Sequence, residues 1–343
     1  MVKYFDPQLI SDPFDDPGLF LDLVFERRAL LFDLGDLSSL APRKILRIAH
    51  VFITHRHMDH FIGFDQLLRC LLGRQKSIGI WGPLGLIAAV QNKLSAYEWN
   101  LIEGYEGNLQ IHVSELSPNG ELTSARFCGA NRFVREDLES TTCNDGVLLD
   151  DPGFTVKGAF LEHGIPVLAF AVEERVRINI CRSRVEEMGL AVGPWLNVFK
   201  QAILAGESPQ KPIPVHWSNP DSTSTPTLPL DVLQSKIMKL THGRKIAYVV
   251  DAAYTPENAD AIVSLARNAD ILFIEAHFLQ EDAERATARN HLTAHQAGAL
   301  AACSNVKVLH TFHYSPRYRG REMEIVQEAD AAFRGSRRAE ESD

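Results

Sequence analysis

The residues best suited to chemistry in this 343-residue chain lie in one short run, Thr54-His55-Arg56-His57-Met58-Asp59-His60. His55 and His57 stand two residues apart, so both side chains can face one ion. Asp59 and His60 follow at positions from which they could bind a second ion. Imidazole and carboxylate groups are ligands for zinc and similar divalent metals. The run therefore predicts a metal site.

Two coordination shells need further ligands from elsewhere in the chain. Three candidates flank apolar runs: His163, Asp251 and His313. Each also has an ordinary interpretation, as a turn histidine, an aspartate before a helix and a loop histidine. From the residues alone, both interpretations stay open.

These polar residues come at or just beyond apolar runs that we predict to be strands, and strand ends are rigid mounts for ligands. Short strands alternate with longer helical patterns, which indicates a layered α/β architecture. Strands are predicted at Ala29–Phe32, Val51–Thr54, Ser77–Trp81, Phe154–Phe160, Val167–Val172, Lys245–Val250, Ile271–Ile274 and Val306–Thr311. Helices are predicted at Asp65–Gly73, Leu84–Ala96, Pro256–Asn268, Glu281–Ala288 and Ala294–Cys303.

Composition limits the classes of protein that fit. The formal net charge of −9 argues against binding nucleic acid by bulk electrostatics, although residues 175–200 carry five basic and two acidic side chains. The five cysteines are odd in number and form no Cys-x-x-Cys pair, so we expect reduced thiols and a cytoplasmic location. The sequence predicts no membrane span and no secretory leader.

The order of the candidate ligands resembles the metallo-β-lactamase fold, and several motifs resemble ribonuclease Z, the tRNA 3′-end processing endonuclease. Asn290-His291-Leu292-Thr293 is similar to its His-x-Thr motif, and His313-Tyr314-Ser315-Pro316-Arg317-Tyr318 to its closing motif. Phe32–Gly35, Glu275–Phe278 and Met188–Pro194 resemble three further segments. The resemblance covers most of Ala29–Tyr318.

The resemblance implies roles for the predicted ligands. One ion would be bound by His55, His57 and His163, and the other by Asp59, His60 and His313, with Asp251 bridging the two. Asp33 would orient the histidine cluster from a second shell. The ions would be two divalent cations, Zn²⁺ first, with Mn²⁺ or Fe²⁺ as alternatives.

His291 is the predicted proton donor, oriented by Glu275 or a neighbouring carboxylate, and Asp59 belongs to the same catalytic group. Thr293 and Gln296 fit a capping box, which would place His291 in the loop before a helix and Thr293 in the second shell. Ser315 and Arg317 are predicted to contact a substrate phosphate, with a structural ion pair as an open alternative for Arg317.

Two other histidines receive weaker assignments. His277 occupies a position where the family usually has threonine, and its role stays open. His295 falls inside the first turn of the same predicted helix, and we interpret it as a surface or packing residue.

The resemblance implies a metallo-β-lactamase αββα sandwich with a protruding arm. We expect one domain over residues 1–334, which includes the arm at 175–230 and an insertion at 98–152, and a disordered tail at 335–343. The Pro-rich residues 206–230 are predicted to form an extended loop.

The resemblance implies that the function is cleavage of precursor tRNA at its 3′ end and that the protein is a homodimer. Another RNA, a single-stranded nucleic acid or a small diester is the alternative substrate. Hydrolysis of esters, lactones or thioesters is a weaker alternative. A non-catalytic binding protein with the same fold is the alternative from another class.

Overall fold

The computed structural model describes the chain except for residues 1–3, 25, 176, 219–225, 242 and 341–343. These residues divide into two compact units, one of residues 1–173 and 244–343 and the other of residues 174–243. The predicted arm at 175–230 falls within the second unit. The second unit is described separately below.

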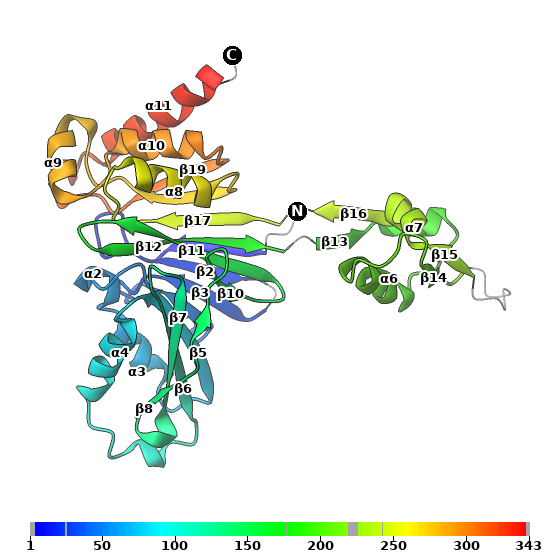
Figure 1. Cartoon of the computed structure of the whole chain (residues 1–343), viewed down its shortest axis with the longest axis horizontal. Coiled ribbons are helices and arrows are strands. Elements are labelled where there is room, and N and C mark those ends of the chain that lie inside the picture. The colour runs from blue at the N-terminus through cyan, green and yellow to red at the C-terminus, as the bar shows by residue number, and fades with distance from the viewer. Residues whose placement is uncertain (1–3, 25, 176, 219–225, 242, 341–343) are drawn as a thin grey trace. The chain divides into compact units, whose positions relative to one another are not determined.

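Two sheets form the centre of the first unit (Figure 1). One sheet has the strand order β1-β2-β3-β4-β5-β6-β7-β8, with β9 beside β7, and the other has the order β10-β11-β12-β17-β18-β19. Strands β3 to β6 are mutually parallel, and so are β17 to β19. The first sheet comprises β1 (Phe5–Leu9), β2 (Leu19–Leu23), β3 (Arg28–Phe32), β4 (Ile48–Phe52), β5 (Lys76–Pro83), β6 (Leu109–Leu116), β7 (Glu121–Cys128), β8 (Arg135–Asp137) and β9 (Thr141–Thr142). The second comprises β10 (Val147–Asp150), β11 (Phe154–Glu162), β12 (Pro166–Glu174), β17 (Lys245–Val249), β18 (Ile271–Glu275) and β19 (Val308–Phe312).

Apolar side chains pack between the sheets because the strands are apolar on their inward faces. Phe32, Phe52 and Phe170 meet there with ring centroids 5.2 to 5.8 Å apart. Such close aromatic packing removes large apolar areas from water and favours this arrangement. The two sheets therefore share one buried core.

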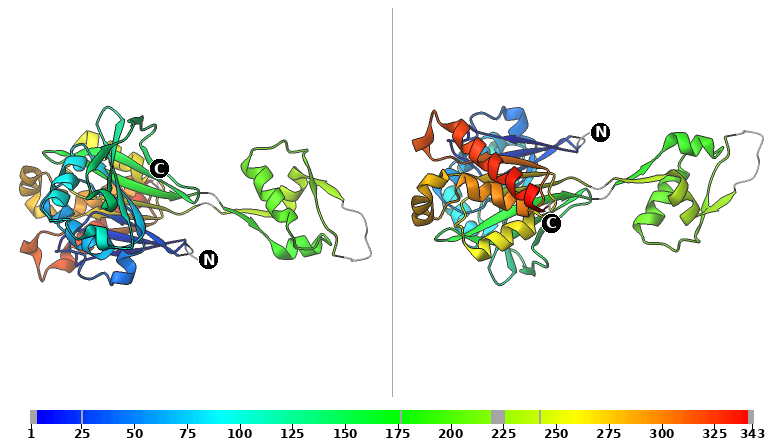
Figure 2. Two further views of the ribbon diagram at one scale, coloured as in Figure 1. Left: turned by 90° about the horizontal axis from the view of Figure 1, so that it is seen from below. Right: turned by 90° about the horizontal axis from the view of Figure 1, so that it is seen from above.

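Helices cover the outer face of each sheet, as Figure 1 shows. The first sheet packs against α3 (Phe64–Leu71) and α4 (Leu86–Ser95), and the second against α8 (Pro256–Ala266), α10 (Ala294–Cys303) and α11 (Glu322–Glu340). In the view from above in Figure 2, α11 lies over α10. Shorter helices are α1 (Pro42–Ile45), α2 (Met58–Phe61) and α9 (Ala283–Arg289). The layers are helix, sheet, sheet, helix, as the predicted αββα sandwich requires.

The structure differs from the predicted insertion at 98–152. Strand β6 continues the parallel part of the first sheet beside β5, and β10 joins the second sheet. The inward side chains Leu109, Ile111 and Val113 belong to the core under the helices. This segment is part of both sheets, and its short strands were hard to recognise because polar turns separate them.

The predicted tail also differs. Helix α11 continues to Glu340, so residues 335–340 are helical, while 341–343 lie outside the described residues. No helix within the described residues is long and apolar enough to cross a membrane. At the other end of the chain, the Pro13 carbonyl accepts a hydrogen bond from the Tyr314 amide at 2.7 Å. The N-terminal segment therefore packs against the segment that follows β19.

The second unit has its own small core. Two strands, β13 (Arg177–Ile180) and β16 (Met238–Thr241), pair antiparallel, and β14 (Pro212–Pro214) pairs with β15 (Thr227–Pro229). Helices α5 (Arg182–Glu187), α6 (Trp195–Leu204) and α7 (Leu230–Ile237) enclose a cluster that includes the buried Trp195 and Phe199. The region predicted as an extended loop thus contains two strands, because proline is tolerated in short edge strands.

Candidate metal centre and catalytic site

The predicted ligands converge at the carboxyl ends of the parallel strands of both sheets. His55, His57, Asp59 and His60 lie in the turn from β4 into α2. His163 lies in the turn between β11 and β12, Asp251 follows β17, and His313 follows β19. Strand ends from two packed sheets meet here because the sheets share one core. The structure brings together all seven predicted ligands.

Among the described residues, four sets of potential ligand atoms each lie within 4.8 Å of one another, and two of them contain the predicted ligands alone. One set is His55, His57, His163 and Asp251, and the other is Asp59, His60 and His313. These are the two ligand groups that the resemblance implied.

Asp251 stands between the two groups. Its Oδ2 atom lies 3.2 Å from His55 Nε2 and 3.1 Å from His60 Nε2, and its Oδ1 atom lies 3.0 Å from His313 Nε2. Burial opposes its ionisation, yet the facing imidazoles of His313 and His60 hold the pKa of Asp251 well below its ordinary value. The carboxylate is therefore charged and positioned to bridge.

Buried polar atoms without partners provide a test of whether these residues fit a metal. His55 Nε2, His60 Nε2 and Asp251 Oδ1 are buried and have no hydrogen bond among the described residues. An unpaired buried polar atom is costly, whereas a bound cation would satisfy all three. The donor set and these atoms fit divalent metal binding.

Asp33 orients His60, a ligand of the second group. Its Oδ2 atom lies 2.9 Å from His60 Nδ1, and its Oδ1 atom accepts the Thr54 amide at 2.7 Å. Burial would lower the pKa of His60, but the carboxylates of Asp33 and Asp251 raise it well above its ordinary value. A carboxylate on Nδ1 fixes the imidazole with Nε2 toward the centre, which is the arrangement found behind metal-binding histidines. Tyr248, which sequence reasoning missed, adds a hydroxyl that donates to Asp33 Oδ2 at 3.1 Å.

Three site residues have left-handed backbone conformations. The φ angles are +59° at Asp33, +54° at Asp251 and +58° at His313. Non-glycine residues seldom adopt this conformation, which costs free energy and occurs preferentially at functional sites. Each turns the chain sharply at or just past a strand end, so that the side chain points into the centre. The sequence offered no signal for this feature.

Asp59 lies beside the second group of ligands. Its Oδ2 atom is 3.3 Å from His60 Nε2. Burial works against ionisation, but the hydrogen bond and charge of His60 hold the pKa of Asp59 well below its ordinary value. Asp59 is therefore present as a carboxylate, the form that binds a cation.

His291 and Glu275 form a buried ion pair next to these ligands. His291 Nδ1 lies 2.8 Å from Glu275 Oε2, and the other carboxylate oxygen accepts the Ala252 amide at 2.6 Å. Burial lowers the pKa of His291, but Glu275 outweighs it and the net shift is upward. Because Nδ1 faces Glu275, the Nε2 proton of His291 is the one left to donate. The proximity of His291 and Glu275 agrees with the predicted catalytic pair.

His277, whose role the sequence left open, packs directly on His291. The two rings are stacked, with centroids 3.9 Å apart and planes 7° apart. His277 Nδ1 lies 2.9 Å from the carbonyl oxygen of His313, and burial first, then the neighbouring histidines, lowers its pKa to about 3. A neutral His277 therefore donates from Nδ1 to that carbonyl and supports both His291 and His313.

The turn that precedes α10 links His163 to this region. Asn290, with φ of +58°, ends α9, and its carbonyl oxygen accepts a hydrogen bond from His163 Nδ1 at 2.7 Å. Asn290 thus contacts the predicted ligand His163, and the motif Asn290–Thr293 did not indicate this contact. The donor at Nδ1 leaves His163 Nε2 free for the centre.

The remaining predicted site residues lie nearby in different settings. Thr293 is the N-cap of α10 in the predicted capping box with Gln296, and its hydroxyl donates to Gln280 at 2.7 Å. Arg317 pairs with Asp282 at 3.0 Å, and Ser315 is buried with its amide donating to the His277 carbonyl at 3.0 Å. Contacts of Ser315 and Arg317 with a substrate phosphate, and a second-shell role for Thr293, stay predictions.

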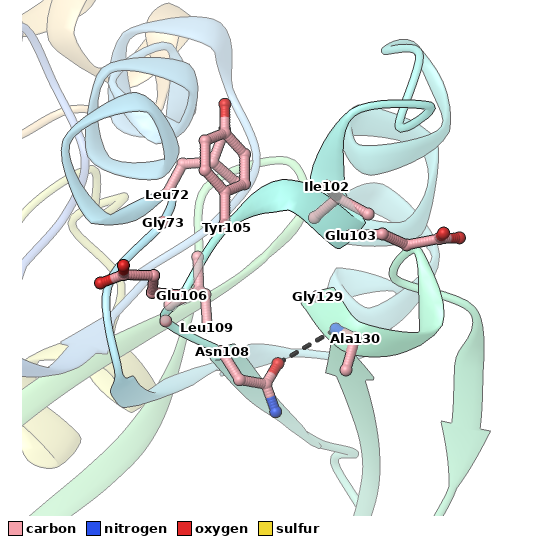
Figure 3. Close-up of a pocket in the computed structure, with 11 residues that line it drawn as sticks. Leu72, Gly73, Ile102, Glu103, Tyr105, Glu106, Asn108, Leu109, Gly129 and Ala130 are labelled. Carbon is pink, nitrogen blue, oxygen red and sulfur yellow. Dashed lines mark hydrogen bonds between the residues drawn. The ribbon is translucent and has the colours of Figure 1, made fainter.

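A pocket of about 510 Å³ adjoins the first ligand group, with His55 and His57 in its wall. A separate pocket of about 270 Å³ is lined mainly by residues of the segment 98–152, together with Leu72 and Gly73 (Figure 3). There Tyr105 packs over Gly73, and Asn108 accepts the Ala130 amide at 3.0 Å. The predicted site residues do not line this second pocket.

Solved structures of other proteins share the fold of this chain. The human short-form tRNase Z is 21% identical over 92% of this chain and 93% of that one, with a TM-score of 0.52. The metallo-β-lactamase fold protein YhfI from Bacillus subtilis is 16% identical over 96% and 94%, with a TM-score of 0.53. This chain has the metallo-β-lactamase fold.

Curated sequences extend the comparison. Ribonuclease Z of Deinococcus radiodurans is 27% identical over 91% of this chain and 90% of its own length. Zinc phosphodiesterase ELAC protein 1 of Bos taurus is 28% identical over 92% and 86%. No family model matches the chain. The resemblance of this metallo-β-lactamase fold chain to ribonuclease Z is confirmed over nine-tenths of its length.

Proposed function

We propose that the chain is a metal-dependent endoribonuclease that cleaves precursor tRNA at its 3′ end. The observation that carries the proposal is the joint position of two potential ligand groups, with Asp251 between them and the His291–Glu275 pair beside them. The similarity to ribonuclease Z and zinc phosphodiesterase sequences supports a diester substrate.

We propose that the site binds two divalent ions, with zinc as the first candidate. His55, His57 and His163 would hold one ion, and Asp59, His60 and His313 the other, with Asp251 between them. When bound, such ions lower the pKa of a coordinated water and neutralise phosphate charge. A homodimer and a cytoplasmic location belong to the same proposal.

The chain's own residues supply the remaining chemistry. Asp33 and the Asn290 carbonyl fix the imidazoles of His60 and His163 with Nε2 inward. When the phosphorus–oxygen bond breaks, the leaving 3′ oxygen gains the Nε2 proton of His291. Glu275 stabilises the protonated form before the transfer, which suits a general acid. The tRNA product then carries a 3′ hydroxyl.

Precursor tRNA processing tests the substrate. The wild-type chain should release the 3′ trailer, and a variant in which residues 177–241 are replaced by a short glycine-serine linker should not, because the second unit would be the tRNA-binding arm. The linker can be short because Arg177 and Thr241 are paired across β13 and β16. Retained hydrolysis of bis-p-nitrophenyl phosphate by this variant would show that the first unit is intact.

His60→Ala and Asp251→Ala should lose both activities. Diester hydrolysis without tRNA cleavage by the wild type would favour another RNA or a small diester as substrate. Absence of both activities in the metal-loaded wild type would favour a binding protein.

A further inference from the structure

The pocket beside His55 and His57 has the composition of a nucleobase site. Its walls are mostly apolar and include Phe160, Ile165 and the prolines Pro83, Pro118 and Pro166. Phe160 is partly buried against the core between the sheets, so its ring is held in place. Unpaired bases bind proteins largely by stacking on such aromatic and apolar surfaces.

One positively charged side chain, that of Arg56, lies in the same wall. Arg56 is exposed, and it forms no ion pair with any of the described residues. Its guanidinium lies against Gly85, where an added Cβ would stand 2.8 Å from Nη2. Gly85, with φ of +92°, leaves room for it. A guanidinium that has no ion pair within the described part of the chain and lies beside an apolar pocket is suited to a phosphate.

The position of the pocket relative to His291 gives the substrate a direction. His57 packs on His163 with centroids 5.6 Å apart, and His163 packs on His291 with centroids 4.7 Å apart. His163 therefore contacts both His57, in the pocket wall, and the proton donor. The leaving 3′ oxygen must face His291, so the nucleoside that keeps the phosphate lies on the side away from it.

We propose that this pocket binds the nucleobase immediately 3′ of the cut, by stacking on Phe160, while Arg56 pairs with the next phosphate along the strand. This inference rests on the proposed diesterase function. Water adds to phosphorus and releases one proton to the solvent, the bond to the upstream 3′ oxygen breaks, and that oxygen takes the proton from His291, which regains a proton from the solvent. The nucleotide in the pocket leaves as a 5′-phosphate. Because the described wall has few hydrogen-bonding groups, any base should be accepted.

Three small diesters with a p-nitrophenolate leaving group isolate the base contact: the thymidine 5′-ester, the thymidine 3′-ester and the methyl ester of p-nitrophenyl phosphate. For the metal-loaded wild type, kcat/KM for the 5′-ester should exceed that for the methyl ester by about tenfold or more. The 3′-ester should show no such advantage. Phe160→Ala should remove most of the advantage, and Phe160→Leu should retain only part of it because the volume is kept without the aromatic face.

The ratio of two substrates in one variant does not depend on how much of the protein is folded. Tyr105→Ala, in the separate pocket of Figure 3, is the matched control and should leave the ratio as in the wild type. A wild-type ratio near one, an equal advantage for the 3′-ester, or a ratio unchanged by Phe160→Ala would overturn the assignment.

Arg56 is tested separately with the thymidine 5′-ester that also carries a 3′-phosphate. This extra phosphate should raise kcat/KM about fivefold in the wild type and have no effect in Arg56→Gln, and the gain should shrink as salt is added. A gain that persists in Arg56→Gln would contradict the role of Arg56.

Binding provides a measurement that does not require turnover. By isothermal titration calorimetry, thymidine 5′-monophosphate should bind more tightly than thymidine 3′-monophosphate, and Phe160→Ala should abolish the difference. Preferred binding of the 5′ isomer without any diester hydrolysis would retain the pocket and overturn the proposed function. Diester hydrolysis with equal binding of both isomers would retain the proposed function and overturn the assignment of the pocket.

Discussion

Residues that follow the first sheet and residues that follow the second sheet take part in the site in different ways. After β4, the buried His55 and His60 are fixed by a second layer, in which Asp33 and the Thr54 hydroxyl contact their Nδ1 atoms. After β18 and β19, the partly buried His277, His291 and His313 support one another.

The contrast suggests a division of labour. The residues that follow the first sheet are suited to binding cations, because the Asp33 carboxylate contacts Nδ1 of His60 and so directs the other ring nitrogen toward the centre. The half on the second sheet is built to handle a proton, because Glu275 pairs with a histidine whose other nitrogen is free. Asp251 belongs to both halves. The following predictions would break or sharpen this division.

His291→Ala should have the largest effect, and only where the leaving group needs a proton. We expect cleavage of precursor tRNA to slow by about 10²–10⁴-fold. Hydrolysis of bis-p-nitrophenyl phosphate should change little, because p-nitrophenolate leaves without protonation. Single-turnover rates for both substrates, with metal content measured in the same samples, test this. An equal loss on both substrates would mean that His291 acts through the metal-binding half.

Asp33→Asn should act on the residues that follow the first sheet, by weakening metal binding. Asparagine tolerates the left-handed backbone at this position, so the change removes charge without adding strain. We expect metal affinity to fall by about 10- to 100-fold, measured by chelator competition and elemental analysis. Both substrates should then be affected equally, and excess metal should restore activity. Loss of tRNA cleavage alone would contradict the division.

His277 offers a smaller and finer test. His277→Thr, the residue that the resembling family usually has, removes the stacked ring and should slow tRNA cleavage by about two- to tenfold at unchanged metal content. His277→Phe keeps a ring but not the hydrogen bond to the His313 carbonyl. Recovery in the phenylalanine variant would assign the effect to stacking, and no recovery would assign it to the hydrogen bond.

The strand that leads into the first half should make the fold sensitive to acid. Burial, then the nearby Arg28, lowers the pKa of His50 in β4 to about 4, and the Trp81 indole donates to its Nδ1 at 3.3 Å. The unfolded chain, with an ordinary histidine pKa of about 6.5, binds more protons between these values. The free energy of unfolding therefore falls as the pH drops from about 6.5 toward about 4.

His50→Gln should reduce this fall by about 1 to 2 kcal/mol, measured by urea unfolding of the metal-free protein at pH 5 and pH 8. His310→Gln, at an exposed position in β19, is the matched control and should have a smaller effect. Equal effects of the two substitutions would contradict the prediction that the acid sensitivity of the fold comes from His50 in the first sheet.

Much of the site was predictable because its ligands sit at the ends of apolar strands. The spacing in His55–His60 and the motif around His291 predicted residues that the structure brings together. The left-handed turns at Asp33, Asp251 and His313 were not predictable, because no glycine or asparagine marks them. The Tyr248 hydroxyl also escaped prediction, because its partner Asp33 is 215 positions away.

The fold shows the same limit. Strong apolar runs and capping residues predicted the elements around the site, including the capping box of α10. The segment 98–152 was misjudged as an insertion because the pairing of β6 with β5 depends on tertiary neighbours. Local sequence gives weak evidence for short strands whose partners are distant.

The spread of the ligands along the chain has a consequence during protein synthesis. Asp33 leaves the ribosome long before His313 and Tyr314, whose amide contacts the Pro13 carbonyl at 2.7 Å. Pairing β19 with β18 completes the centre, and such distant contacts form late. A nascent or prematurely terminated chain that lacks β19 and His313 therefore has no complete centre, so nuclease activity would arise only after these residues are synthesised and β19 has paired with β18.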